Sequence, residues 1–442
     1  MSVFGSRLSL KASLAAVAAM IIGMMILLAV VQVAHAAPAT VVHSGPRDQP
    51  RIALTFDDNF NTSRALAVLE ALRRTQTPAT MFVTGDYVAG IPQITSSLAR
   101  GDFEIADHSM SHPDLTRLSW SSLLYEVGGG TRTFTALTGV RTAPLIRPPY
   151  GATNSLVAEA AGQNGFLYVV NWDIDTLDWT GRSADGIVRH VLDNARNGAI
   201  VLMHLSAAHT YEAVPRIVEG LRNRGYELVT VSRLLKGDRR FLDTVSTGAV
   251  GAAVGRLVDA GIMSGYNQDY FGPEDGITRA QTAKVMVQLM GVHTEEVERT
   301  AGRTFIDVPP QQAADGSWLS YPFDYVEEAA AAGLVQGRID GQGRRVFEPY
   351  ASVTRLQLAR ILARMAREAK GYQDGTVGSG WVFGDVPPED RADVGLAAQL
   401  GLMRGYQGGM FRPDEPATRA QVAVVACRFL DLPAFGDVGT MD

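Results

Sequence analysis

The sequence has a single cysteine, Cys427, among its 442 residues. Because one cysteine cannot form an internal disulfide, the fold must be stabilised by apolar cores and any bound metal, and we expect Cys427 to pack as a small apolar side chain. Charged residues are also few, 19% of the chain, and the net charge of −6 gives no general attraction for nucleic acid. We therefore predict no nucleic-acid partner, and any anionic partner must be bound by a local group of cations.

The N-terminal segment, residues 1–36, is expected to direct export. Arg7 and Lys11 precede an uncharged apolar run, 12–33, which is followed by a tripeptide, 34–36, with alanine on both sides of a histidine. This order is typical of a signal peptide with its cleavage site, although the run is also long enough to remain as a membrane anchor. Both alternatives put the rest of the chain outside the cell, either secreted or at the surface.

The length of the chain and its 46% hydrophobic residues predict two or more globular domains. After an expected linker, residues 37–49, the region 50–235 alternates short β-rich runs with helix patterns such as Ser63–Arg74 and Ser183–Arg196. This alternation predicts parallel strands with crossover helices, in an open sheet or a closed barrel, and both architectures collect reactive residues at the carboxyl ends of the strands. The predicted strands are Arg51–Phe56, Thr80–Val83, Phe103–Ala106, Leu145–Arg147, Phe166–Trp172, Ala199–Met203 and Glu227–Thr230.

Beyond a charged linker, residues 236–240, the sequence becomes alanine-rich and repeats itself three times. A Phe-x-Asp sequence opens the second and third repeats, and Phe241-Leu242-Asp243 is a less regular version in the first. Each repeat then has a Phe-x-Pro sequence and a Thr-Arg pair at the predicted start of a helix. The threonine and the glutamine three residues later form a capping box, in which each side chain binds a free backbone N–H. We place the repeats at residues 241–294, 302–368 and 380–433.

Two adjacent carboxylates, Asp57 and Asp58, follow the first predicted strand, where burial is costly unless a cation binds them. His108 and His112 follow the third strand, and histidines four residues apart fall on one side of a helical turn, a spacing that suits a metal ion. One aspartate and two histidines make an open three-ligand site with a position left for water. Each pattern alone has an ordinary alternative: a solvated turn for the aspartates, and hydrogen-bonded histidines at the surface or in a core.

Three later strand ends supply further polar residues. Arg147 leaves the fourth strand in a loop rich in proline and glycine, which could hold it against a carboxylate or could be a plain turn. His204 ends the sixth strand and could be a metal ligand, a proton donor or a packed residue, and Asp178 could keep it charged. Because five successive strand ends each carry one part of a hydrolytic site, the order of the motifs favours an active site over chance.

In this order the motifs resemble those of the polysaccharide deacetylases of carbohydrate esterase family four, over residues 50–235. The resemblance implies an α/β fold, a distorted (β/α) barrel, with a divalent metal, and zinc is the best match to the ligand types. It implies that Asp57 is the general base, oriented by Arg147, and that His204 is the general acid, tuned by Asp178. The implied metal ligands are Asp58, His108 and His112.

The same resemblance assigns residues around the acetyl group. A backbone N–H near Tyr150 would stabilise the oxyanion, and Trp179 and Leu202 would line a pocket for the acetyl methyl group. The alternative for Trp179 and Leu202 is ordinary core packing. The family usually follows its paired aspartates with Gly-Pro, whereas this chain has Asn59-Phe60, so the turn beside the sugar cleft differs.

The three C-terminal repeats resemble S-layer homology repeats, which implies an all-α domain of three packed modules. That family attaches non-covalently to anionic secondary cell-wall polymers, and the resemblance implies that Arg279, Arg355 and Arg419 bind the polymer through guanidinium contacts to carboxylates. Alternatively, each arginine is a solvated residue in the first turn of its helix. The usual glutamate of this motif is glutamine here, which preserves capping but removes a negative charge.

Together these motifs predict a secreted, metal-dependent polysaccharide N-deacetylase that acts on peptidoglycan or a chitin-like polymer of N-acetylglucosamine. The repeats are expected to hold it at the cell wall or cell surface. Two alternatives remain open: an inactive sugar-binding protein of the envelope, and an O-acetyl esterase on the same fold.

Overall fold

The chain divides into two compact units, residues 1–235 and 236–442, which we describe separately. The expected signal peptide or membrane anchor, residues 1–36, and Asn59-Phe60 lie outside the described residues. Within the described part of the chain, no helix has both the length and the hydropathy that a membrane crossing requires. The computed structural model describes residues 37–58, 61–237, 239–244, 248–292, 303–313, 315–373 and 383–435.

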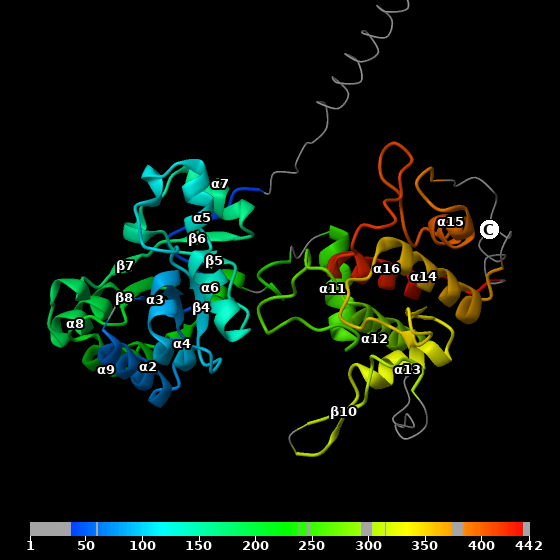
Figure 1. Ribbon diagram of the computed structural model, residues 1–442. Coiled ribbons are helices and arrows are strands. Elements are labelled where there is room, and N and C mark those ends of the chain that lie inside the picture. The colour runs from blue at the N-terminus through cyan, green and yellow to red at the C-terminus, as the bar shows by residue number, and fades with distance from the viewer. Residues whose placement is uncertain are drawn as a thin grey trace, which may run out of the picture. The chain divides into compact units, whose positions relative to one another are not determined.

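The first unit is built on a curled sheet of nine strands within its described residues, all of them parallel (Figure 1). Their order is β1-β6-β5-β4-β3-β2-β8-β7, and β9 pairs with the start of β2. Since β1 and β7 are the two ends of this order, the predicted distorted barrel takes the form of an open half-barrel. The strands are β1 Thr40–Val42, β2 Arg51–Asp57, β3 Thr80–Val83, β4 Glu104–Asp107, β5 Leu145–Ile146, β6 Tyr168–Val170, β7 Ile174–Asp175, β8 Ile200–His204 and β9 Glu227–Val229.

Strand β2 shows how the sheet presents a reactive group. Every residue of β2 after the first is buried. Because side chains alternate along a strand, Leu54 and Phe56 share one face, where they pack in a core with Leu72 of α2. Asp57 therefore projects from the opposite face, at the carboxyl end of the strand. The helices of this unit are α2 Thr62–Arg74, α3 Gly85–Gly90, α4 Pro92–Leu98, α5 Trp120–Glu126, α6 Gly129–Thr138, α7 Ser155–Gln163, α8 Ala184–Asn194, α9 Thr210–Asn223 and α10 Val231–Lys236, with 3₁₀ turns at Leu115–Arg117, Pro149–Gly151 and Asp178–Thr180.

All of the predicted strands are present, but two strands of this sheet, β1 and β7, were not predicted. The segment 37–49, expected to be a linker, contains β1, in which Val41 pairs with Val169 of β6. The segment 37–49 therefore forms one edge of the sheet in part. Strand β1 has only three residues, too few for the alternation of a strand to be recognised. The expected linker 236–240 is also partly structured. Its first residue, Lys236, is buried, and the ammonium of Lys236 lies 2.8 Å from the carboxylate of Asp269.

The second unit is mainly helical, but the expectation of an all-α domain is wrong. Two antiparallel hairpins lie in the middle repeat, β10 Gln311–Gln312 with β11 Trp318–Leu319, and β12 Arg338–Ile339 with β13 Arg345–Val346. In the second hairpin, the carboxylate of Asp340 accepts backbone N–H bonds from Gln342 and Arg344. These bonds stabilise a tight turn, which is not a helical conformation. The helices are α11 Gly248–Asp259, α12 Arg279–Met290, α13 Phe323–Ala331, α14 Arg355–Lys370, α15 Arg391–Gln399 and α16 Arg419–Asp431, with a 3₁₀ turn at Pro388–Asp390.

The three predicted capping boxes are confirmed. In each, the threonine hydroxyl accepts the N–H of the glutamine, and the glutamine side chain accepts the N–H of the threonine. Glutamine thus performs the capping that glutamate usually performs. The boxes are Thr278 with Gln281, Thr354 with Gln357, and Thr418 with Gln421.

The aspartate that opens each repeat fixes the Phe-x-Pro sequence of the same repeat. Its carboxylate accepts two successive backbone N–H bonds, the first from the phenylalanine. The less regular first repeat follows the same rule, so its opening sequence has kept its structural role. The bonds to phenylalanine are Asp243 to Phe271 at 2.9 Å, Asp307 to Phe347 at 2.8 Å and Asp385 to Phe411 at 2.8 Å.

The repeats are joined in a ring by the arginines of the Thr-Arg pairs. Each guanidinium reaches the next repeat, where its Nε donates to the carbonyl of the Phe-x-Pro phenylalanine and its face lies over that ring. The last repeat closes the ring by contacting the first. These bonds are Arg279 to Phe347 at 2.7 Å, Arg355 to Phe411 at 2.9 Å and Arg419 to Phe271 at 2.9 Å.

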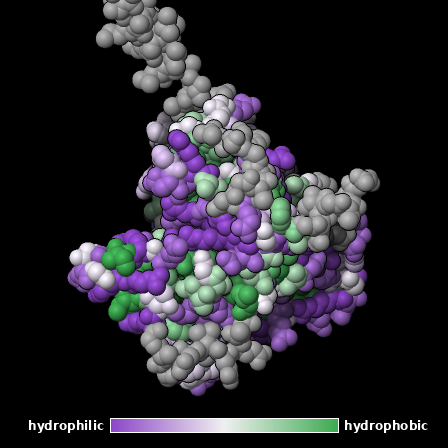
Figure 2. Space-filling model, turned by 90° about the vertical axis from the view of Figure 1, so that its right-hand side faces the viewer, coloured by the Kyte–Doolittle hydropathy of each residue, from purple (hydrophilic) through white to green (hydrophobic). Residues whose placement is uncertain are grey.

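A continuous core lies inside this ring, with Phe271, Phe347 and Phe411 almost completely buried. The face seen in Figure 2 is mostly hydrophilic, and its hydrophobic residues form small patches. The three buried phenylalanines are part of the core, and the guanidinium groups of the arginines pack over their rings.

Candidate active site

A cavity of about 710 Å³ opens at the carboxyl ends of the strands in the first unit. It collects side chains from the ends of β2 and β8 and from the segments after β4, β5 and β7. Of the residues predicted to form the site, Arg147 and Asp178 lie behind the cavity wall, where each contacts a lining residue. The others line it directly: Asp57, Asp58, His108, His112, Tyr150, Trp179, Leu202 and His204.

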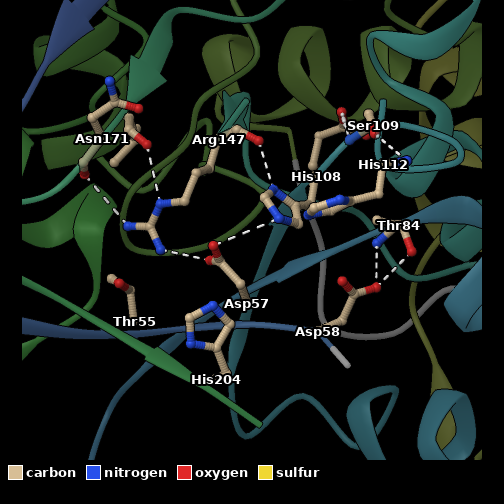
Figure 3. A network of polar contacts seen from close by, with 12 residues as sticks. Thr55, Asp57, Asp58, Thr84, His108, Ser109, His112, Arg147, Asn171 and His204 are labelled. Atoms are coloured by element: carbon tan, nitrogen blue, oxygen red, sulfur yellow. Dashed lines mark hydrogen bonds and ion pairs between the residues drawn. The ribbon is translucent and has the colours of Figure 1, made fainter. Parts of the chain in front are cut away.

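Asp57 is held as a carboxylate by a buried arginine (Figure 3). Its Oδ1 accepts a hydrogen bond from Nη1 of Arg147 at 2.7 Å, and its Oδ2 lies 3.6 Å from Nε2 of His108. Arg147 is completely buried, and its other nitrogens donate to the carbonyls of Val170 and Asn171. Burial raises the pKa of Asp57, but Arg147 and two nearby histidines outweigh it, and the net pKa is lower than usual. The sequence-based pairing of Arg147 with Asp57 is thus present.

Asp178 favours the protonated form of His204. Nδ1 of the imidazole lies 2.7 Å from Oδ1 of Asp178, and the backbone N–H of His204 donates to Oδ2. The hydroxyl of Thr210 also donates to Oδ2, which fixes the carboxylate. Burial lowers the pKa of His204, but Asp178 and Asp57 more than offset it, and the net pKa is raised. Because Asp57 and His204 are register partners on β2 and β8, both side chains face the same cavity.

The three predicted metal ligands line the cavity but are not gathered around one point. Oδ2 of Asp58 accepts hydrogen bonds from the backbone N–H and the hydroxyl of Thr84, at 2.8 and 2.6 Å. Nδ1 of His108 is bonded to the carbonyl of Arg147 at 2.7 Å. Among the described residues, no three His, Cys, Asp or Glu side chains are grouped so that they could hold a metal ion. Thr84 engages only Oδ2 of Asp58, and the assignment of Asp58, His108 and His112 as metal ligands stays a prediction.

The donor set itself suits a divalent cation. Burial lowers the pKa of His108 to about 4, and burial also lowers the pKa of His112. Both shifts favour the neutral imidazole, the form that binds a metal. Since Nδ1 of His108 must donate to the Arg147 carbonyl, its lone pair is on Nε2. Burial raises the pKa of Asp58 to about 7, which a nearby cation would reverse.

The two histidines lie on a loop, so the predicted helical turn is wrong. Ser109 and His112 both have left-handed backbone angles, with φ of 75° and 65°. Such angles are uncommon for residues with a side chain and reverse the chain twice within a few residues. The rings of His108 and His112 nevertheless come together, with centroids 4.9 Å apart. The four-residue spacing therefore predicted the right neighbours for the wrong reason.

Two buried carboxylates that sequence reasoning missed hold this loop. Asp107, completely buried, accepts the N–H of Ser109 at 2.9 Å. Glu126 accepts the N–H groups of Met110 and Ser111, at 3.0 and 2.9 Å. The position of Asp107, directly before the first histidine and at the end of an apolar strand, was a usable signal. Nothing in the local sequence pointed to Glu126, which reaches the loop from α5.

The residues assigned to the acetyl group differ in their surroundings. Leu202 is 4% exposed within β8, whereas Trp179 is 61% exposed at the edge of the cavity, which excludes core packing for the tryptophan. Tyr150 is also exposed and has a left-handed backbone, with φ of 61°. Its ring lies against that of His112, with centroids 4.8 Å apart. The cavity thus has one apolar wall and one aromatic rim.

Comparison with known proteins decides the family. A family model described as polysaccharide deacetylase matches residues 44–169. A peptidoglycan-N-acetylglucosamine deacetylase of Bacillus cereus is 33% identical over 195 residues, which cover 43% of this chain and 91% of that relative. The chain belongs to the polysaccharide deacetylase family. A model described as S-layer homology domain matches residues 240–283 and 382–423, the first and third repeats.

Other relatives match a similar share of the chain. The peptidoglycan-N-acetylglucosamine deacetylase PgdA of Listeria monocytogenes is 36% identical over 184 residues, and the match spans 42% of this chain and 38% of PgdA. A chitooligosaccharide deacetylase of Bradyrhizobium is 32% identical over 41% of this chain and 90% of its own length. Among solved structures, a family 4 carbohydrate esterase from Streptomyces lividans in complex with acetate is 35% identical over 40% of this chain and 90% of that one, with a TM-score of 0.37.

In the S-layer homology repeats, the three arginines predicted to bind the wall are engaged in the ring described above. Arg355 and Arg419 are each 6% exposed, so they are not solvated first-turn residues. Arg355 also reaches a groove of about 380 Å³ between repeats, where Arg404 and Arg428 line the wall together with Glu274. Three arginines and one glutamate therefore line a single groove.

Proposed function

We propose that this polysaccharide deacetylase removes N-acetyl groups from an amino-sugar polymer, with Asp57 as general base and His204 as general acid. The observation that carries the proposal is the pairing of charges across one cavity. Arg147 favours the ionised form of Asp57, and Asp178 favours the protonated form of His204. Hydrolysis of an amide needs both forms at the same pH, one to take a proton and one to give it.

Asp57 takes the proton of the attacking water. The bond from Arg147 fixes the direction of the carboxylate, and the remaining oxygen, Oδ2, is the one near His108 and the cavity. Arg147 cannot compete as an acid, because a guanidinium stays protonated in proteins. The role of Arg147 is therefore to orient Asp57 and to keep it charged.

His204 gives its proton to the departing nitrogen. An amide nitrogen leaves poorly unless it is protonated, and a positioned acid typically raises the rate about 10²–10⁴-fold. Asp178 binds Nδ1, so the proton on Nε2 is the one available to the substrate. A backbone N–H near Tyr150 stabilises the oxyanion, and Trp179 and Leu202 enclose the acetyl methyl group.

We propose that Asp58, His108 and His112 would hold a divalent cation, with zinc as the best match. One carboxylate and two neutral imidazoles are the ligand types that zinc prefers, with a further position left open. When bound, the cation supplies Lewis-acid chemistry, which polarises a carbonyl and makes water easier to deprotonate. The chain contributes by favouring the neutral form of both imidazoles and by fixing His108 through the Arg147 carbonyl.

Peptidoglycan is the first candidate substrate, and a chitin-like polymer is the second. The relatives in Bacillus and Listeria are named for peptidoglycan, whereas the Bradyrhizobium relative is named for chitooligosaccharides. The C-terminal repeats favour a wall substrate, since S-layer homology repeats suggest attachment to cell-wall polymers. We propose that the protein is secreted, by a cleaved signal peptide or with an N-terminal anchor, and is retained at the cell surface.

The repeats bind an anionic wall polymer. Of the arginines predicted for this role, Arg355 lines the groove with Arg404 and Arg428, while Arg279 and Arg419 support it through the ring. Arg404→Gln is the cleanest test, because this change leaves the ring bonds intact. It should weaken binding of the full chain to purified cell walls about tenfold, the effect of losing one charged hydrogen bond. Exposed Arg391 provides the matched control, as Arg391→Gln.

The enzymatic proposal is tested by acetate release from N-acetylated and O-acetylated oligosaccharides, with and without a chelator. N-deacetylation that the chelator abolishes supports it, with peptidoglycan and chitin oligomers compared in parallel. Release from the O-acetylated substrate alone would make the protein an esterase. No release from either, with sugar binding retained, would make it an inactive binding protein.

A further inference from the structure

The loop that carries His108 and His112 has a backbone conformation that its own sequence does not favour. Two of its residues, Ser109 and His112, have left-handed backbone angles although neither is glycine. Such residues persist where surrounding structure over-determines them. Something outside the loop must therefore hold it in place.

Asp107 supplies the first restraint. Its Oδ2 accepts the N–H of Ser109 at 2.9 Å and that of Gly128 at 3.0 Å, and its Oδ1 accepts the N–H of Thr131 at 3.0 Å. Gly128 and Thr131 lie at the start of α6, so one carboxylate ties the loop to the amino end of a helix. A carboxylate suits both, since free N–H groups cluster at a helix start.

Close packing supports the same connection. A Cβ atom on Gly130 would lie 1.8 Å from the carbonyl oxygen of Val83, and one on Gly129 would lie 2.4 Å from Cβ of Met110. The start of α6 can approach the loop only because these positions are glycine. The bonds of Asp107 thus lie in a tightly packed contact between the loop and the start of α6.

Glu126 supplies the second restraint, from α5. Its Oε2 accepts the N–H groups of Met110 and Ser111 at 3.0 and 2.9 Å, and its Oε1 accepts the hydroxyl of Ser111 at 2.7 Å. Glu126 is 8% exposed, so these bonds are shielded from water. Asp107 therefore fixes the loop just after its first histidine, and Glu126 fixes it just before the second.

We propose that Asp107 and Glu126 are positioning residues that set the distance between the His108 and His112 rings and thereby the affinity of the protein for its divalent cation. Neither touches the substrate. The inference rests on the proposed function, because it assumes that the two histidines bind the cation. Partners that orient metal ligands from behind typically change metal affinity 10–100-fold when they are altered.

The test compares Asp107→Asn and Glu126→Gln with a matched control, Glu104→Gln, in the full chain. Glu104 lies at the other end of β4, where its carboxylate also accepts a hydroxyl and a backbone N–H, from Thr80 and Ser232. The measurement is the dissociation constant for zinc, obtained by competition with a coloured chelator, alongside the thermal unfolding of each metal-free protein. All three variants should lose stability, but only the first two should bind zinc 10–100-fold more weakly.

Ser111→Ala keeps the test decisive if Asp107→Asn fails to fold. It removes only the hydroxyl bond to Glu126 and should weaken zinc binding several-fold. Zinc affinity that is unchanged in Glu126→Gln and Ser111→Ala, or reduced equally in Glu104→Gln, would overturn the inference alone. A wild-type protein that binds no zinc, cobalt or manganese would overturn both the inference and the proposed metal site.

Discussion

The two units bury arginine for different purposes. In the deacetylase domain, Arg147 is enclosed completely and its charge is directed at another charge, the Asp57 carboxylate 2.7 Å away. In the repeats, Arg355 and Arg419 are nearly as deeply buried, but their nitrogens donate to backbone carbonyls and their faces lie between aromatic rings. One arginine tunes a reactive group, whereas the others join modules.

This difference follows from how each unit is built. In the half-barrel, each strand end contributes a different side chain, so no contact of the site is repeated. In the second unit, each repeat contributes the equivalent arginine to the equivalent phenylalanine of the next repeat, so the same type of contact occurs three times. A change in the first unit should therefore affect chemistry, and a change in the second should affect stability or attachment.

His204→Ala should produce the largest effect and should separate chemistry from attachment. Loss of the general acid is expected to lower kcat/KM about 10²–10⁴-fold, while binding to purified walls is unchanged. Acetate release and wall sedimentation measure the two properties. His43→Ala, an exposed histidine outside the cavity, is the control. Full activity in His204→Ala would remove the assigned acid from the mechanism.

Arg355→Ala should destabilise the ring without touching the chemistry. It leaves the carbonyls of Phe411 and Arg404 without a charged donor, and we expect the free energy of unfolding of the second unit to fall by about 3 kcal/mol. Arg279→Ala should cost less, because the described contacts of Arg279 include one such carbonyl bond. Denaturant unfolding measures both. Exposed Arg391→Ala should be neutral, and an equal loss there would argue against the ring.

Asp178→Asn should move the pH profile of the deacetylase. The acid must be protonated, so kcat/KM falls as pH rises through the pKa of His204. Because the charge and hydrogen bond of Asp178 raise this pKa, removing them should shift the alkaline limb of the profile to lower pH. Asp185→Asn, which removes a surface carboxylate paired with Arg216, should leave the limb in place. If the alkaline limb of Asp178→Asn stays at the same pH, His204 is not the group whose titration sets that limb.

Gln281→Glu should have the smallest effect. Oε1 of Gln281 accepts the N–H of Thr278 at 3.0 Å, and a glutamate could accept the same bond. A negative charge near a helix start adds about 0.3–1 kcal/mol, so the free energy of unfolding should rise by no more than about 1 kcal/mol. Thr278→Ala, which removes the cap, should lower it by about 1 kcal/mol. A destabilised Gln281→Glu protein would show that glutamine does more than cap.

Local sequence was enough for features that local forces decide. Apolar runs bounded by polar residues fixed the strands, and so the order in which Asp57, Arg147 and His204 arrive at one edge of the sheet. The capping boxes followed from the position of threonine three residues before glutamine. Strands β1 and β7 of the sheet, three and two residues long, were not predicted. Segments this short show little periodicity, and the equally short β5 was found only as part of a predicted run, Leu145–Arg147.

Features that depend on distant partners were not accessible in the same way. The bond from Arg147 to Asp57 joins residues 90 positions apart, and it was expected only because a known family has the same motifs. The bond from Arg419 to Phe271 joins residues 148 positions apart, and sequence reasoning assigned Arg419 to the wall polymer or to solvent instead. Glu126, which reaches the histidine loop from α5, had no local signal at all.

The sequence by itself determined which chemical groups this protein can bring to a cavity, because strand ends and helix starts are set by residues that are neighbours in the chain. The tertiary structure alone decided how those groups are held. The left-handed loop of the two histidines depends on buried carboxylates that join it to α5 and α6, and the closed ring depends on arginines whose partners lie far along the chain. Such groups are stable only where the fold supplies every bond that water would otherwise provide.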